Sequence, residues 1–175
     1  MRVSTRCAAG LALAALWGCS PALDWREVRP PGSSAQAIFP CKPASHARKV
    51  TLAGAAVEMS LYGCAASQVS YALAFADMVD PALVAPALEE LARAAPVHLQ
   101  ASEPGASAPL AVPGMTPHER AVLWTLSGRL PDGRRVQERM ALFAYGTRVY
   151  QATAVGERLD PSAWDSFLAG LKVGP

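Results

Sequence analysis

Few side chains in this 175-residue chain have the types and spacing needed for nucleophilic or metal chemistry. The three histidines are His46, His98 and His118, and none stands at close metal-ligand spacing from another histidine or from a cysteine inside the fold. His98 and His118 flank a loosely patterned segment and could converge across it, although exposed histidines without a ligand role are the favoured interpretation. Cys41 with His46 as its base is a further nucleophile arrangement that we disfavour. We therefore expect that the protein is not an enzyme and that it binds neither a cofactor nor a metal ion.

Two cysteines, Cys41 and Cys64, lie inside the predicted fold. In an oxidising compartment two such thiols pair more often than they stay free. A redox-active pair is disfavoured because such cysteines usually lie close in sequence, as in a Cys-x-x-Cys motif. We predict a structural disulfide worth about 3 kcal/mol in the chain-entropy model. Free buried thiols are the alternative.

Five arginines gather around a predicted turn at residues 131–133, and guanidinium groups suit bidentate contact with phosphate and carboxylate. If several share one sheet face, they form a patch for anionic headgroups or an acidic protein partner. The interpretation that we favour is a solvated sheet face whose charge is balanced by Asp132 and Glu138. The five residues are Arg129, Arg134, Arg135, Arg139 and Arg148.

The first eighteen residues have the pattern of an export signal. Arg2 and Arg6 precede an apolar run that is too short to span a bilayer, which needs about 20 residues. The run ends in Leu16-Trp17-Gly18-Cys19, which resembles the bacterial lipobox. In that family diacylglycerol alkylates the cysteine thiol, and cleavage then leaves the cysteine as the first residue of the mature chain. Trp17 departs from the usual small or aliphatic residue, so an ordinary signal-peptidase cut, with Cys19 a bystander, is the alternative.

The lipobox resemblance implies removal of residues 1–18 and attachment of the mature chain to a membrane through lipid on Cys19. Ser20 stands where inner-membrane retention signals usually carry Asp, which implies the periplasmic face of the outer membrane. An inner-membrane anchor and a soluble periplasmic protein are the alternatives. The formal net charge of +2 falls to zero without Arg2 and Arg6, and no basic run remains, so nucleic acid is not an expected partner.

The elements that would position these residues follow from periodicity. Residues 19–35 are interpreted as a tether with an edge strand at 24–29, and residues 36–175 as one domain. Alternation at 57–62 and 69–75 predicts a hairpin that turns through residues 63–68. Asp80-Pro81 and Asp160-Pro161 each predict a helix start, and the first helix is expected to close at Ala95-Pro96.

The remaining chain has one poorly patterned stretch and three further strands. Residues 97–118 show little periodicity and resemble an irregular segment. Strands are predicted at 122–126, 136–143 and 149–155. Together, the predicted elements indicate an α+β fold with an antiparallel sheet of five to seven strands and two main helices.

Three short motifs accompany this order of elements: Ile38-Phe39-Pro40-Cys41-Lys42-Pro43, Tyr145-Gly146-Thr147-Arg148-Val149-Tyr150 and Phe167-Leu168. Together they resemble, over roughly residues 36–173, a group of exported bacterial proteins whose domain is similar to PsbP. The resemblance implies an α/β/α-like sandwich and supplies no enzymatic site. We expect a non-catalytic binding or assembly module of the cell envelope. The alternative is an envelope enzyme or ligand carrier with a site between the sheet and the 97–118 segment.

Overall fold

The structure, a computed structural model, describes residues 23–101 and 105–175. Within these ranges the chain forms two α-helices and ten strands, and the strands build two antiparallel sheets of seven and three strands. The predicted α+β class is therefore confirmed, with sheet predominating. The expected signal segment and Cys19, the predicted lipidation residue, lie outside the described residues.

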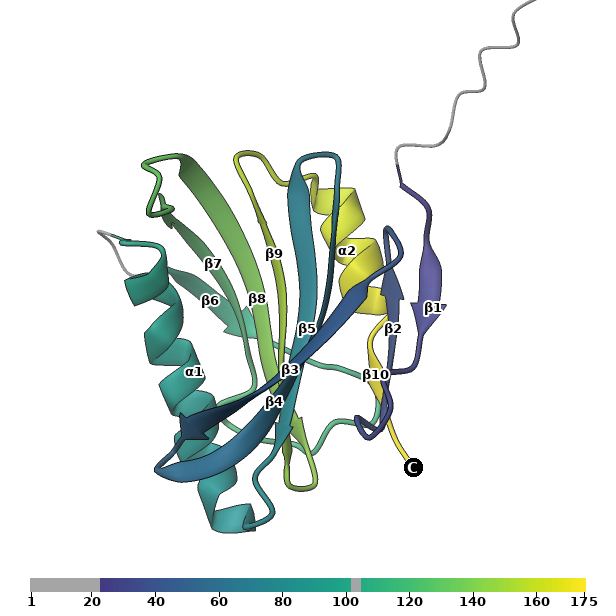
Figure 1. Ribbon diagram of the computed structural model, residues 1–175, viewed down its shortest axis with the longest axis vertical. Coiled ribbons are helices and arrows are strands. Elements are labelled where there is room, and N and C mark those ends of the chain that lie inside the picture. Colours follow the sequence, from purple (N-terminus) through teal and green to yellow (C-terminus); the bar gives the residue numbers. More distant parts are fainter. Residues whose placement is uncertain (1–22, 102–104) are drawn as a thin grey trace, which may run out of the picture.

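The larger sheet has the strand order β3-β4-β5-β9-β8-β7-β6, and every neighbouring pair is antiparallel (Figure 1). The smaller sheet has the order β1-β2-β10, so the predicted edge strand lies at its border. The bounds of the larger sheet are β3 (Ala44–Leu52), β4 (Ala55–Ala66), β5 (Val69–Asp77), β6 (Ala106–Pro109), β7 (Val122–Arg129), β8 (Arg135–Tyr145) and β9 (Arg148–Gly156). Those of the smaller are β1 (Arg26–Val28), β2 (Ala35–Phe39) and β10 (Lys172–Val173).

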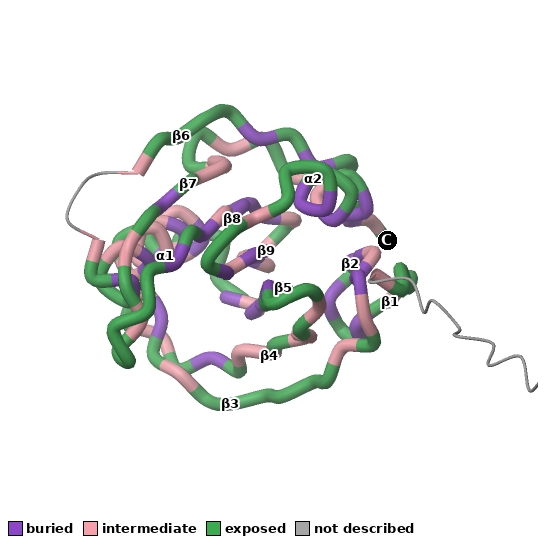
Figure 2. The backbone as a smooth tube through the Cα atoms, turned by 90° about the horizontal axis from the view of Figure 1, so that it is seen from above, coloured by how far each residue is buried: buried purple, intermediate pink, exposed green. Residues whose placement is uncertain are grey.

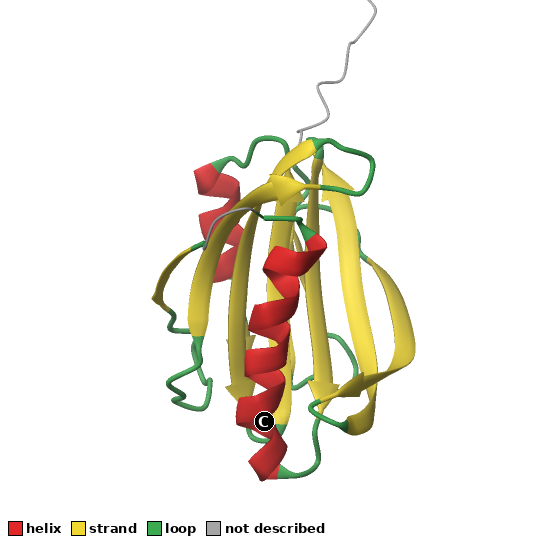
Figure 3. Cartoon of the chain, turned by 90° about the vertical axis from the view of Figure 1, so that its left-hand side faces the viewer, coloured by secondary structure: helices red, strands yellow, loops and turns green. Residues whose placement is uncertain are grey.

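The larger sheet is covered on both faces. Helix α1 (Val84–His98) lies along one face, and α2 (Pro161–Ala169) with the smaller sheet covers part of the other (Figures 1 and 3). Side chains alternate along β8, so Leu142 joins the core under α1 while Phe143 joins the core under α2. Figure 2 shows the consequence, with buried residues on the central strands and the edge strand β3 largely exposed.

Both predicted aspartate caps are present. Asp160 accepts a hydrogen bond from the backbone N–H of Ser162 at 3.0 Å and begins α2. Asp80 caps a single 3₁₀ turn, η1 (Pro81–Leu83), and α1 begins only at Val84. The predicted end of this helix at Ala95-Pro96 is wrong, because α1 continues to His98. Pro96 has no N–H to donate, but the last turn still closes beyond it, since the N–H of Leu99 donates to the carbonyl of Ala95 at 3.2 Å.

The predicted six-residue turn at 63–68 is also wrong. Strand β4 continues to Ala66, and the turn consists of Ser67 and Gln68, with φ angles of 50° and 64°. Two successive positive φ angles are typical of the tight two-residue turns whose twist matches that of the flanking strands. Gly63 therefore lies inside the strand, where an added Cβ would stand 3.3 Å from the carbonyl oxygen of Tyr71.

The expectation of an irregular stretch at 97–118 is wrong at residues 97–98, which end α1, and at residues 106–109, which form β6. Residues 110–118 form a loop, as expected, but its Leu110 and Val112 are buried in the core under α2. The loop is bonded to distant elements, since Pro113 accepts from the N–H of Val173 at 2.9 Å. Because these partners lie far away along the chain, the local sequence carries no periodic signal for them.

Cys41 and Cys64 form the predicted disulfide, which is thus confirmed, with their Cα atoms 6.0 Å apart. The bond joins the chain just after β2 to strand β4, and so links the smaller sheet to the larger one. None of the helices in the described ranges is both long and apolar enough to span a lipid bilayer.

Candidate anion-binding face

Strands β7 and β8 present one polar, solvent-facing surface on the side of the sheet that carries α2. The strict alternation of β8 buries Val136 and Met140 under α1 and turns Arg135, Gln137 and Arg139 to the opposite side. The register pairs these three residues with Arg129, Ser127 and Thr125 of β7. We call this surface the arginine face; it consists of Thr125, Ser127, Arg129, Arg135, Gln137 and Arg139.

Two of its guanidinium groups stand directly opposite each other. Arg129 and Arg135 are register partners at the end of the β7–β8 ladder, and both are exposed. Like charges in this position destabilise a sheet by up to about 1 kcal/mol. Among the described residues no carboxylate lies within ion-pair distance of either side chain. Among the described residues, the side chain of Arg129 donates one hydrogen bond, to the carbonyl of Gly133 at 3.0 Å. The pair is thus a site of local positive charge.

Two other arginines of the predicted patch lie close to this pair but are neutralised. Arg139 faces Asp165 of α2 at 3.8 Å. Arg134 lies in the β7–β8 turn and donates from Nε to Oδ2 of Asp132 at 2.7 Å. That hydrogen bond is the main reason why the pKa of Asp132 is lowered. The free positive charge of the face therefore belongs to Arg129 and Arg135.

Arg148 does not belong to the patch. It lies opposite Tyr145 at the far end of β8, ten residues from Arg135, which is about 33 Å along a strand. Its guanidinium pairs with Asp77 at 3.3 Å. The Asp77 carboxylate also accepts from the Thr147 hydroxyl at 2.6 Å, which is the largest cause of its lowered pKa.

The expectation that Glu138 balances these arginines is wrong. Period-two alternation sends its side chain to the other face of the sheet, where it is buried with 7% exposure. Its register partners are Leu126 of β7 and Val155 of β9, both apolar. Burial alone raises the pKa of Glu138 to about 7, and no charge or hydrogen bond from the described residues offsets it.

The histidines do not gather into a site. The Nδ1 atom of His118 accepts the backbone N–H of Arg120, whose side chain pairs with Glu89 of α1 at 3.3 Å. His98 ends the same helix nine residues later, about 14 Å further along its axis. His46 lies on the edge strand β3, and Cys41 is in the disulfide, so the thiolate–imidazole pair does not form. In the part of the chain that the structure describes, no cluster suited to a metal ion exists.

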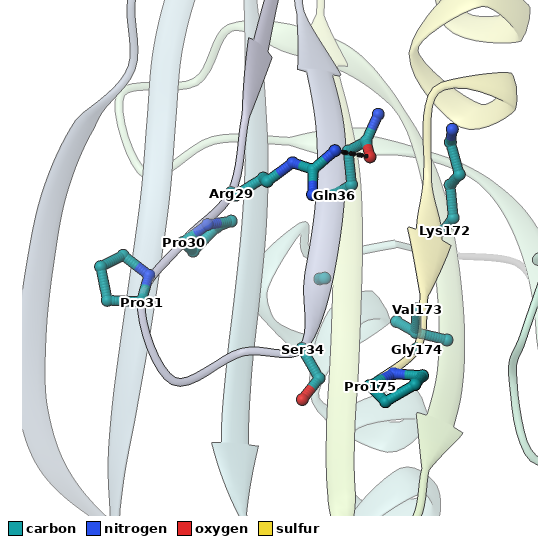
Figure 4. A pocket seen from close by; sticks show the side chains of 10 residues that line it. Arg29, Pro30, Pro31, Ser34, Gln36, Lys172, Val173, Gly174 and Pro175 are labelled. Carbon is teal, nitrogen blue, oxygen red and sulfur yellow. Dashed lines mark hydrogen bonds between the residues drawn. The ribbon is translucent and has the colours of Figure 1, made fainter.

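Two hollows accompany these surfaces. One of about 470 Å³ lies beside the arginine face and is lined by Gln100, Arg129, Arg135 and Glu157, among others. Another of about 440 Å³ lies against the smaller sheet, where Arg29 donates to the amide oxygen of Gln36 at 2.9 Å (Figure 4). In the first hollow, Arg129 and Arg135 line the wall without an ion-pair partner among residues 23–101 and 105–175.

The chain matches no protein-family model, and no curated protein is similar to it in sequence.

Proposed function

We propose that this protein is a lipid-anchored envelope protein on the periplasmic face of the outer membrane, acting as a non-catalytic binding or assembly module. The observation that carries the proposal is the pairing of Arg129 with Arg135. Two like charges held opposite each other, without a carboxylate from the described residues, gain stability when an anionic group binds between them. The proposed binding surface is the arginine face.

The lipid anchor is supported by the motif that ends in Cys19 and by the use of the other cysteines. Cys41 and Cys64 are bonded to each other, so the described residues contain no free cysteine that could form a disulfide with Cys19. The sheet is covered by α1 on one side and by α2 on the other, which supports assignment to the PsbP-like sandwiches. In this sandwich α2 leaves the ends of β7 and β8 uncovered, and the arginine face is available there for recognition.

A ligand carrier is the second candidate function. The hollow of about 470 Å³ beside the arginine face favours it, because Gln100 of the 97–118 segment lines it together with Arg129 and Arg135. A carrier binds its small anion without a membrane or a partner protein. Calorimetric titration of the protein with inorganic phosphate tests this alternative.

The main experiment is a pull-down from envelope fractions with the native anchor intact, compared with the Cys19→Ala variant. The second comparison pairs Arg129→Gln/Arg135→Gln with Arg48→Gln/Lys49→Gln, which removes the same charge from the exposed strand β3. Loss of the captured partner with the first double variant alone supports the proposal. Mass spectrometry of the mature N-terminus tests the anchor separately, and an unmodified N-terminus at any other residue contradicts it.

A further inference from the structure

The arginine face and the beginning of the described chain lie at the same end of the molecule. Gln137, within the arginine face, is the register partner of Gly156 on β9. Gly156 is in turn the register partner of Val69 on β5, beside the β4–β5 turn. Cys64 lies near that turn on β4 and is bonded to Cys41. The N–H of Asp24 donates at 2.9 Å to the carbonyl of the residue just before Cys41. Figure 1 shows the β7–β8 turn and the start of β1 at the same end.

The length of chain between this end and the proposed anchor is short. Cys19 precedes Leu23, the first described residue, by four positions. Four residues span at most about 14 Å, even when fully extended. A lipid on Cys19 therefore holds this end of the domain beside the membrane surface, within reach of the lipid headgroups.

We propose that the arginine face binds the phosphate groups of anionic lipids in the membrane that holds Cys19, and so fixes the orientation of the domain on that membrane. This inference rests on the proposed function, since it takes the anchor as given. The charge of the face suits this partner, because guanidinium groups bind phosphate in a bidentate manner and Arg129 and Arg135 have no carboxylate partner among the described residues.

The strength of this contact is modest but sufficient in an anchored protein. Each arginine near an anionic surface contributes about 1 kcal/mol, so two arginines favour the bound orientation by about 30-fold. In free solution such a contact is weak. Once the lipid on Cys19 is inserted, the arginine face and the lipid phosphates are held on the same membrane. The effective concentration of phosphate at the face is then in the millimolar range. The face therefore acts after anchoring.

The experiment is arginine-selective labelling with phenylglyoxal of the full acylated protein in vesicles, quantified by mass spectrometry. One set of vesicles contains phosphatidylcholine alone, and the other also contains phosphatidylglycerol. We expect labelling of Arg129 and Arg135 to fall about 30-fold in the anionic vesicles and to recover in high salt, which screens the attraction. Arg48 on the exposed strand β3 is the internal reference and should not change.

A variant sharpens the test. In Arg129→Gln the protection of Arg135 should fall to about 5-fold, because one arginine remains. Equal labelling of the native protein in both kinds of vesicle overturns the inference. Protection that occurs only in whole envelopes overturns it as well, and identifies an acidic protein as the partner.

Failure of the anchor is distinguishable from failure of the face. The same mass spectra report whether the N-terminal peptide carries acyl chains. If it carries none, the proposed function fails, and the chain is then held on vesicles by an N-terminal histidine tag and nickel-chelating lipid. Protection of Arg129 and Arg135 on anionic vesicles in that arrangement supports the lipid contact, and its absence refutes that contact.

Discussion

Glu138 allows the sharpest test of the packing between β8 and α1. The change is Glu138→Gln, which keeps the size of the side chain and removes its charge. The carboxyl lies between Leu126 and Val155 with 7% exposure, and burial raises its pKa from 4.5 to about 7. In the unfolded chain the same group ionises near its ordinary pKa.

The size and sign of the effect follow from these two pKa values. Between pH 4.5 and about 7 the native protein binds more protons at this site than the unfolded chain, so the free energy of unfolding falls as the pH rises. A shift of about 2.5 pH units corresponds to a loss of about 3 kcal/mol, which is complete above the native pKa. A domain is typically stabilised by about 5–15 kcal/mol, so a loss of this size is readily measured.

The assay is urea unfolding of the native protein and the variant at about pH 4 and about pH 8, without reductant. The buried amide that the variant carries in place of the carboxyl has its own cost, but that cost does not depend on pH. We therefore expect the stability of the variant relative to the native protein to rise by about 3 kcal/mol from the lower to the higher pH. Glu119→Gln removes the same charge from an exposed loop and is the control. A stability difference that is the same at both pH values refutes the reasoning.

Three further predictions concern the disulfide, a close backbone approach and the arginine face. Replacing Cys41 and Cys64 by alanine should lower the free energy of unfolding by about 3 kcal/mol, measured in urea, since the bond closes a loop with a separation of 23 residues. Gly114→Ala should cost about 3 kcal/mol or more, because a Cβ there would stand 1.8 Å from the carbonyl oxygen of Val173 at a φ of +84°. Gly133→Ala, at a φ of +85° but in open space, should cost only about 1 kcal/mol in the same assay; equal losses would contradict this account. Arg135→Thr should raise stability by about 0.5 kcal/mol in thermal unfolding while weakening the proposed anionic contact, and a fall in stability would show that the paired charges do not repel.

Local patterns were sufficient for much of the fold and for part of the candidate site. Alternation at 69–75 predicted the strand β5, although this strand is buried on both sides from Leu73 to Ala76, and the Asp-Pro pairs predicted both capped starts. The same alternation in β8 carries a signal that a count of charges overlooks. Arg135 and Arg139 are in phase with each other, whereas Glu138 is in phase with the buried Met140. Period-two alternation places Arg135 and Arg139 on one side of β8 and Glu138 on the other, and the prediction of Glu138 as a balancing charge did not take this into account.

Other features depend on contacts that no local pattern encodes. Val112 is buried because the loop that carries it is bonded to β10, about sixty residues later in the chain. Arg148 is remote from Arg135 because β8 extends over eleven residues before the hairpin turns. Val112 and β10 are distant in sequence and close in space, whereas Arg148 and Arg135 are close in sequence and distant in space. Both distances depend on the length and pairing of the strands, which a local pattern does not give.

The disulfide also determines how the molecule responds to mechanical force. A pull on the N-terminal end loads β1 first and then β2, the two strands that precede Cys41. Cys41 lies 18 positions after Leu23, so this part of the chain spans no more than about 65 Å when it is fully extended. Beyond that length the disulfide transmits the tension directly to β4, inside the seven-stranded sheet. The bond thus limits how far β1 and β2 can be pulled away before the force acts on the seven-stranded sheet. Single-molecule pulling with and without reductant measures this limit as a difference in contour length.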